Sequence, residues 1–147
     1  MNIPQLSVFL ENKPSRLQPV LKILADHAVN IKIFTIAEMN DYGVLRMIVD
    51  KPEQAHAALK ANHFTCSLAD VLAVALEDTP GALLRLIDAF STRRQLNIEY
   101  MYAFTDRHGA HSIMIFRFED IEAAKRALQE EGYTILKWLA PTPEANG

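Results

Sequence analysis

The residues best suited to bind a small charged molecule lie in a loop between an apolar run and a helix-like segment. The loop reads Glu77-Asp78-Thr79-Pro80-Gly81-Ala82-Leu83. Gly81 leaves room for close approach to the backbone, and the free N–H groups at a helix start attract a carboxylate. Asp78 can accept hydrogen bonds from an ammonium group. The loop therefore suits the two charges of a free amino acid. The structural alternative is that Pro80-Gly81 only shapes a tight turn and Asp78 only caps the helix.

Patterns of known catalytic chemistry do not occur in the chain. It has no glycine-rich phosphate loop, no nucleophile elbow and no His-Glu-x-x-His helix. Only His108 and His111 lie close together among the histidines, and a metal site there would need a further ligand. Cys66 falls in an apolar strand, as a small buried residue would. We therefore expect no catalytic residue, no metal and no cofactor. A small catalyst that uses His108 or His111 stays open as an alternative, as does the interpretation of both as solvated turn residues.

The loop has a second copy in the first half of the chain. Glu11-Asn12-Lys13-Pro14-Ser15-Arg16-Leu17 precedes it by 66 residues, and Asn30-Ile31 likewise precedes Asn97-Ile98. Similar pairs continue along both halves, with a small drift in the offset. We infer a tandem duplication with a boundary near Leu72.

In each half we expect the same order of strands and helices around the loop between the first strand and the first helix. In the first half we expect a strand at Leu6–Leu10, a helix with Pro14 in its first turn, strands at Ile31–Met39 and Val44–Val49 around the turn Asn40–Gly43, and a helix from Lys51-Pro52. In the second half we expect Thr79 as a helix N-cap, strands at Asn97–Phe104 and Ile113–Phe118 around Asp106–Gly109, and a helix at Glu119–Glu131 that stops at Gly132.

This order, βαββαβ in each half, predicts an α+β fold of two ferredoxin-like units, each an antiparallel sheet with two helices on one face. A unit of about 70 residues is marginal as an independent core. The run Val71–Leu76 is apolar on both faces, which predicts that the sister half or a second chain covers it. We expect a homodimer.

Composition excludes several classes of protein. The chain has 147 residues, half of them hydrophobic, and a net charge of −3, which argues against binding nucleic acid through phosphate contacts. No apolar run is long enough to span a membrane, and Met1–Leu10 lacks the features of a secretory signal. We expect a cytoplasmic protein with no nucleic-acid or membrane partner.

Both loops, followed by an amphipathic helix and an Asn-Ile pair, resemble the signature of the ACT domain. The resemblance covers about residues 3–140 and implies ACT domains at 1–71 and 72–140, with a tail at 141–147. Members of this family are small-molecule sensors, most often of amino acids. Their ligands usually lie between ACT units, against the first strand-to-helix loop and a neighbouring second strand.

Carried over by position, the resemblance implies a set of ligand-binding residues in each half. These are Asn12, Ser15, Arg16, Leu17, Ile36 and Glu38 in the first half, and Asp78, Pro80, Gly81, Ala82, Leu83, Tyr100, Met101 and Tyr102 in the second. Ser15 departs from the family pattern, which has glycine there. The following Arg16 either clamps a carboxylate or is a surface helix residue. Tyr100 and Tyr102 share one side of their strand, where they line a pocket for a large or aromatic amino acid or pack across strands.

We therefore expect a sensor without chemistry of its own, which binds a free amino acid and acts on a partner such as a regulated enzyme. The alternative is a dedicated regulatory subunit of a biosynthetic enzyme, resembling the small subunit of acetohydroxyacid synthase. The second domain of such a subunit should not repeat the loop motif as this chain does.

Overall fold

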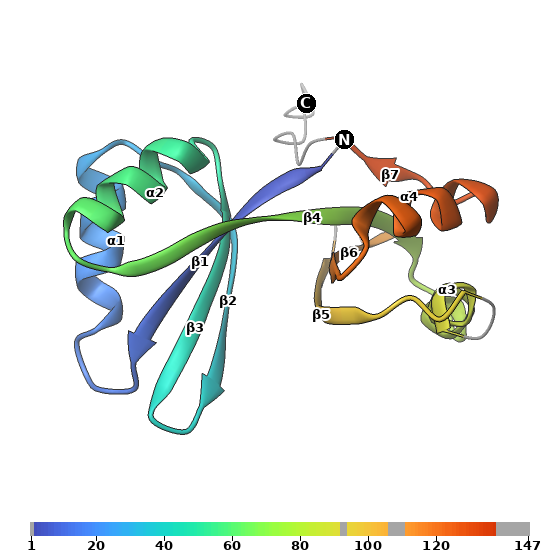
Figure 1. Ribbon diagram of the computed structural model, residues 1–147, viewed down its shortest axis with the longest axis horizontal. Helices are drawn as coiled ribbons and strands as arrows, with labels where there is room; N and C mark the ends of the chain where they lie inside the picture. Colours follow the sequence, from blue (N-terminus) through green and yellow to red (C-terminus); the bar gives the residue numbers. More distant parts are fainter. Residues whose placement is uncertain (1, 92–93, 106–110, 138–147) are drawn as a thin grey trace, which may run out of the picture. The chain divides into compact units, whose positions relative to one another are not determined.

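A computed structural model of the chain describes residues 2–91, 94–105 and 111–137. Its contacts divide the chain into two units (Figure 1). The first unit comprises Pro4–Ala69, and the second comprises Asp70 onward together with the first residues of the chain.

The first unit is a four-stranded sheet with two helices on one face. Its elements are β1 (Ile3–Glu11), α1 (Leu17–Asp26), β2 (Ile31–Met39), β3 (Tyr42–Val49), α2 (Pro52–Ala61) and the start of β4 (Thr65–Glu77). The strands lie in the order β2-β3-β1-β4, with β3 antiparallel to both of its neighbours. In Figure 1, α1 and α2 lie together on one side of β1, β2 and β3.

Alternate residues of β1 and β3 form the core of this unit with the two helices. The buried members are Leu6, Val8 and Leu10 of β1, Leu45, Met47 and Val49 of β3, Val20 and Leu24 of α1, and Ala55 and Leu59 of α2. The period of two in the strands and the period of three to four in the helices direct these side chains to one layer.

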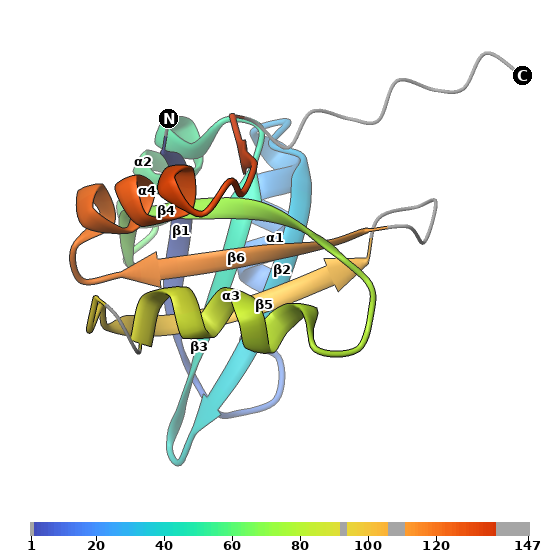
Figure 2. The same ribbon diagram turned by 90° about the vertical axis from the view of Figure 1, so that its right-hand side faces the viewer.

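The second unit repeats the arrangement. Its elements are the end of β4, α3 (Ala82–Ser91), β5 (Ile98–Thr105), β6 (His111–Phe118), α4 (Ile121–Glu130) and β7 (Ile135–Leu136). The strand order is β5-β6-β4-β7. Figure 2 faces the side of this sheet that carries α3 and α4.

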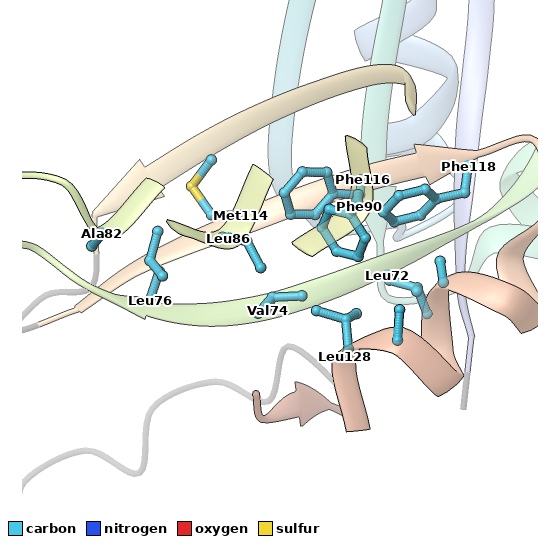
Figure 3. Close-up of a cluster of buried hydrophobic side chains, with 12 residues drawn as sticks. Leu72, Val74, Leu76, Ala82, Leu86, Phe90, Met114, Phe116, Phe118 and Leu128 are labelled. Atoms are coloured by element: carbon cyan, nitrogen blue, oxygen red, sulfur yellow. The ribbon is translucent and has the colours of Figure 1, made fainter. Parts of the chain in front are cut away.

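Three phenylalanines lie at the centre of the second core (Figure 3). The ring of Phe90, from α3, meets Phe118 edge-on at 4.9 Å between centroids and Phe116 at 5.8 Å. Leu72, Val74 and Leu128 pack around them (Figure 3). The predicted fold class, two ferredoxin-like βαββαβ units, is confirmed.

The boundary between the halves is continuous in backbone structure. The last strand of the first unit and the first strand of the second are one element, β4, of 13 residues. Leu72 and Val74 face the core of the second unit, and the alternate residues Val71 and Ala73 are fully buried too. Residues Val71–Val74 are therefore buried on both faces of β4, which accounts for the absence of polar residues among them.

Two predicted helix starts are wrong for the same reason. α1 begins at Leu17, not in the turn of Pro14, and α3 begins at Ala82, so Thr79 is not its N-cap. Ser15 has φ 64° and Gly81 has φ 82°. A left-handed residue cannot continue a right-handed helix, so each helix starts after it. Thr79 contributes through its carbonyl instead, which accepts from the Ala82 N–H at 3.2 Å.

The other predicted boundaries agree with the structure to within a few residues. The first hairpin turn is shorter than predicted, because Asn40 takes φ 50° and Tyr42 and Gly43 already belong to β3. α2 begins at Pro52 as predicted, and Gly132, at φ 78°, ends the last helix. The predicted turn Asp106–Gly109 and the tail 141–147 lie outside the described residues. No helix in the described part of the chain is long and apolar enough to cross a membrane.

Candidate functional site

The first unit has a pocket of about 350 Å³ at the carboxyl end of β1. It is lined by Leu10, Glu11, Asn12, Lys13, Arg16, Leu17, Ile36, Glu38 and Gly43. Asn12, Arg16, Leu17, Ile36 and Glu38 are among the ligand-binding residues predicted from the sequence. Ser15, which was predicted with them, is exposed in the loop and does not line the pocket.

Strand pairing explains how residues far apart in the sequence meet at this pocket. β3 lies between β1 and β2, and its Gly43 is opposite both Leu10 of β1 and Glu38 of β2. A Cβ atom on Gly43 would be 3.5 Å from the Ala37 carbonyl oxygen and 3.6 Å from Ile36 Cγ2, which is ordinary contact. The missing side chain therefore leaves space at the pocket without any requirement for an unusual backbone.

The β1–α1 loop is held to the β2–β3 hairpin by Asn12. Its backbone N–H donates to the Asp41 carbonyl at 2.9 Å. Its side-chain Nδ2 donates to Glu38 Oε1 at 3.3 Å and to the Asn40 carbonyl at 3.2 Å. Asn12 thus positions the loop in addition to lining the pocket.

Opposite charges are already paired at the mouth of the pocket. Glu11 Oε2 lies 3.2 Å from Lys13 Nζ and 3.4 Å from an Arg16 guanidinium nitrogen. The hydrogen bond and positive charge of Lys13, with the charge of Arg16, lower the pKa of the Glu11 carboxyl below its ordinary value. Arg16 is therefore engaged by a neighbouring carboxylate in this structure. A bound carboxylate would have to compete for it.

The second unit has a pocket of about 330 Å³ whose walls differ from those of the first. It is lined by Ala75, Leu76, Glu77, Ala82, Arg85, His111, Gly132, Tyr133 and Thr134. Ala82 is the one residue here that the sequence predicted as ligand-binding. Asp78, Pro80, Gly81 and Leu83 lie exposed in the loop or the first turn of α3 and do not line it.

The predicted residues of β5 lie on two faces of the sheet. Met101 is opposite Phe116 and packs against the core, on the side of the helices. Tyr100 is opposite Arg117 and Tyr102 is opposite Ile115, so the two tyrosines share the other face. Among the described residues, the structure does not bring Tyr100, Met101 or Tyr102 into either pocket.

Sequence reasoning missed several lining residues of the second pocket. Arg85 lies one turn inside α3, and His111 is directly opposite Glu77 across the β4–β6 pair. The sequence indicates His111 as a metal-ligating, catalytic or solvated turn residue but not as part of a ligand pocket, and its neighbour His108 lies outside the described residues. No cluster of three metal-ligating side chains occurs in the described part of the chain.

Cys66 shows no sign of nucleophilic activation. Its thiol is partly buried, lies 3.7 Å from the His56 carbonyl oxygen, and has a pKa that burial raises above the ordinary value. A raised thiol pKa reduces the thiolate fraction, which is the reactive form. Cys66 therefore behaves as a packing residue.

Comparisons with known proteins agree with this architecture. A family model described as an ACT domain pair matches residues 1–138. Among solved structures, protein BT0572 from Bacteroides thetaiotaomicron is 36% identical over 92% of each chain, with a TM-score of 0.85. No curated protein matches the chain.

Two further solved structures share the fold at lower identity. The regulatory subunit of aspartate kinase from Thermus thermophilus, in its ligand-free form, is 19% identical over 86% of this chain and 91% of its own, with a TM-score of 0.63. The corresponding subunit from Thermus flavus is 18% identical over 88% and 92%, with a TM-score of 0.62. Because the family model covers far more than half of the chain and both units fold as βαββαβ, the chain belongs to the ACT domain pair family.

Proposed function

We propose that this protein is a regulatory sensor that binds a free amino acid in the first-unit pocket and has no chemistry of its own. The observation that carries the proposal is the charge pattern of that pocket. Lys13 and Arg16 supply cations, and Glu11 and Glu38 supply carboxylates, around a volume of about 350 Å³. A zwitterion presents the complementary pair of charges, and charge-assisted hydrogen bonds to both ends are the strong ones.

The ligand completes its contacts, in this proposal, at an interface between two copies of the chain. β2 is an edge strand of its sheet, and it exposes Phe34 by 62% and Ile36 by 49%. An exposed apolar edge strand is a template for pairing with another chain. Antiparallel pairing of two β2 strands about Thr35 would set Phe34 opposite Ile36.

The same register would set Lys32 of each chain opposite Glu38 of the other, which is a favourable cross-strand pair. Ile36 and Glu38 also line the pocket. A ligand there would touch the dimer contact and favour the state in which that contact is formed. This coupling is how amino-acid binding would be reported to a partner enzyme. Two solved proteins of the same fold are regulatory subunits of aspartate kinase, which supports a regulatory role.

A thermal-shift screen against the twenty amino acids at millimolar concentration tests the proposal. A ligand that binds only the folded state at 100 times its Kd adds about 2.7 kcal/mol of stability, which raises the midpoint clearly. Gly43→Val should abolish that shift, because the new side chain enters the pocket at a position that tolerates a Cβ. Arg16→Gln should weaken it, and Lys22→Gln, a surface cation of α1 outside the pocket, should leave it unchanged.

A shift that survives Gly43→Val would refute the assignment of the first-unit pocket. Twenty amino acids without effect would refute a sensor that acts alone. Co-purification with a catalytic chain would then support the dedicated regulatory subunit in its place.

A further inference from the structure

The pocket of the second unit is built from four separate parts of the chain. Its walls come from the end of β4, the first turn of α3, the start of β6 and the connection between α4 and β7. Strand pairing fixes two of these parts, because Glu77 is opposite His111 across β4 and β6. The connection between α4 and β7 is held to β4 by a hydrogen bond from the Ala75 N–H to the Thr134 carbonyl at 3.4 Å.

The charged side chains of this pocket are not tied to one another. In the first-unit pocket, Glu11 is paired with Lys13 and Arg16. Within the described residues, the side chains of Glu77, Arg85 and His111 form no ion pair and no hydrogen bond. A carboxylate and a guanidinium therefore line one pocket without neutralising each other, and both are available to a ligand.

Gly81 leaves open the space that the Arg85 guanidinium occupies in this structure. A Cβ atom on Gly81 would come within 3.1 Å of an Arg85 guanidinium nitrogen, and φ at this glycine is 82°. The guanidinium thus lies over the β4–α3 loop, in space that the glycine leaves open. This gives the loop glycine a second role besides its backbone conformation.

We infer that this pocket is a second binding site for an amino-acid zwitterion, whose carboxylate Arg85 binds and whose ammonium group Glu77 binds. The inference rests on the proposed function only in taking an amino acid as the ligand. The site differs from the one that the ACT resemblance implies for this half, since the α4–β7 connection forms a wall and Tyr100–Tyr102 do not. A guanidinium–carboxylate contact of this kind supplies orientation as well as affinity.

The second site also differs in what surrounds the ligand's side chain. Tyr133 and His111 line the second pocket, whereas the aliphatic side chains of Ile36 and Leu17 line the first. An aromatic ring and an imidazole favour a polar or aromatic side chain over an aliphatic one. The two units would then respond to different amino acids.

Glycine amides report on the two pockets separately in an NMR titration of the full chain labelled with [15N]glycine. Gly43 lines the first pocket and Gly132 lines the second. The probes are the twenty amino acids, each unlabelled and at millimolar concentration, with acetate and methylammonium as ligands of single charge. We expect at least one amino acid to move the Gly132 resonance more than either single-charge ion does.

Arg85→Gln and Glu77→Gln should each weaken the binding seen at Gly132 by about tenfold or more, the effect of losing a hydrogen bond between charged groups. Arg126→Gln, an exposed arginine of α4 outside the pocket, is the matched control and should change nothing. Gly43 should respond to its own ligand equally in all these variants.

Several outcomes separate this inference from the proposed function. A response at Gly43 with none at Gly132 overturns the second site and leaves the sensor proposal standing. A response at Gly132 alone supports the second site and contradicts the first-unit pocket. A Gly132 response that survives Arg85→Gln but disappears in Gly43→Val is transmitted from the first pocket, and also overturns the second site.

Discussion

The left-handed conformation of Ser15 predicts that this position is strained and that its counterpart is not. Ser15 has φ 64° and Gly81, at the equivalent place in the second loop, has φ 82°. A Cβ atom makes this conformation unfavourable by about 1–2 kcal/mol, a penalty that glycine does not have. Ser15→Gly should therefore relieve strain in the first loop, and Gly81→Ser should introduce it in the second.

The size of the effect follows from two opposing contributions. Glycine gains more conformational freedom in the unfolded chain, which costs about 0.4–1 kcal/mol of stability and offsets part of the relief. Ser15 is exposed, so its replacement removes no packing. The expected net stabilisation by Ser15→Gly is thus about 0.5–1 kcal/mol from these two contributions. Gly81→Ser should destabilise by a similar amount, because the Arg85 side chain that a Cβ would meet can move aside.

Urea and thermal unfolding of the two variants and of Ser15→Ala measure these changes. For a domain of this length, 1 kcal/mol corresponds to about 2–4 °C in Tm. Ser15→Ala keeps the Cβ atom and its penalty, so it should unfold close to the unmodified protein. If Ser15→Gly is no more stable than Ser15→Ala, the Cβ atom carries no penalty at this position and the argument from backbone strain is refuted.

Three further predictions concern the loop, its charges and the second core. Asn12→Ala removes the side-chain bonds to the hairpin and should lower the free energy of unfolding by about 1 kcal/mol; an unchanged urea midpoint would contradict the positioning role. The folded state lowers the pKa of Glu11, so this group stabilises the fold above its unfolded pKa, and the contribution is lost as pH falls through the lower folded value. The pH dependence of urea unfolding in the acidic range should therefore be shallower in Glu11→Gln, and identical profiles would exclude this linkage. Phe90→Ala should cost about 3–5 kcal/mol, seen as a lower urea midpoint, because it empties the centre of the second core; a loss near 1 kcal/mol would mean that the core closes around the gap.

Much of the fold could be predicted from local patterns. β2 was predicted at Ile31–Met39 with both ends correct, since its apolar and β-branched residues end at a polar turn. Pro52 marks a helix start because its ring fixes φ, and Gly132 marks a helix end because glycine readily adopts a left-handed φ of 78°. The repeated loop predicted both units, because each unit contains the same signals in the same order.

Local patterns failed where a boundary carries no signal of its own. The order βαββαβ in each half predicts one strand at the end of the first half and another at the start of the second, but the structure has the single strand β4. Leu68–Val71 contains no glycine or proline that would end a strand between them. The helix starts at Leu17 and Ala82 depend on a left-handed residue before them. A glycine such as Gly81 indicates a possible left-handed conformation, because it adopts one without a steric penalty. A serine does not, so the sequence does not predict the left-handed conformation of Ser15.

The repeat, the order of elements, the fold class and the loop before the first helix of each half all follow from the amino-acid sequence. These depend on periodicity and on residues whose backbone preferences act over a few positions. Which side chains face the pockets depends on the three-dimensional fold. Gly43 reaches Leu10 and Glu38 through pairing across three strands, and Glu77 meets His111 across another pair. Strand register brings such residues together whatever their separation in the sequence. For that reason the sequence does not predict that Arg85 and His111 line the second pocket.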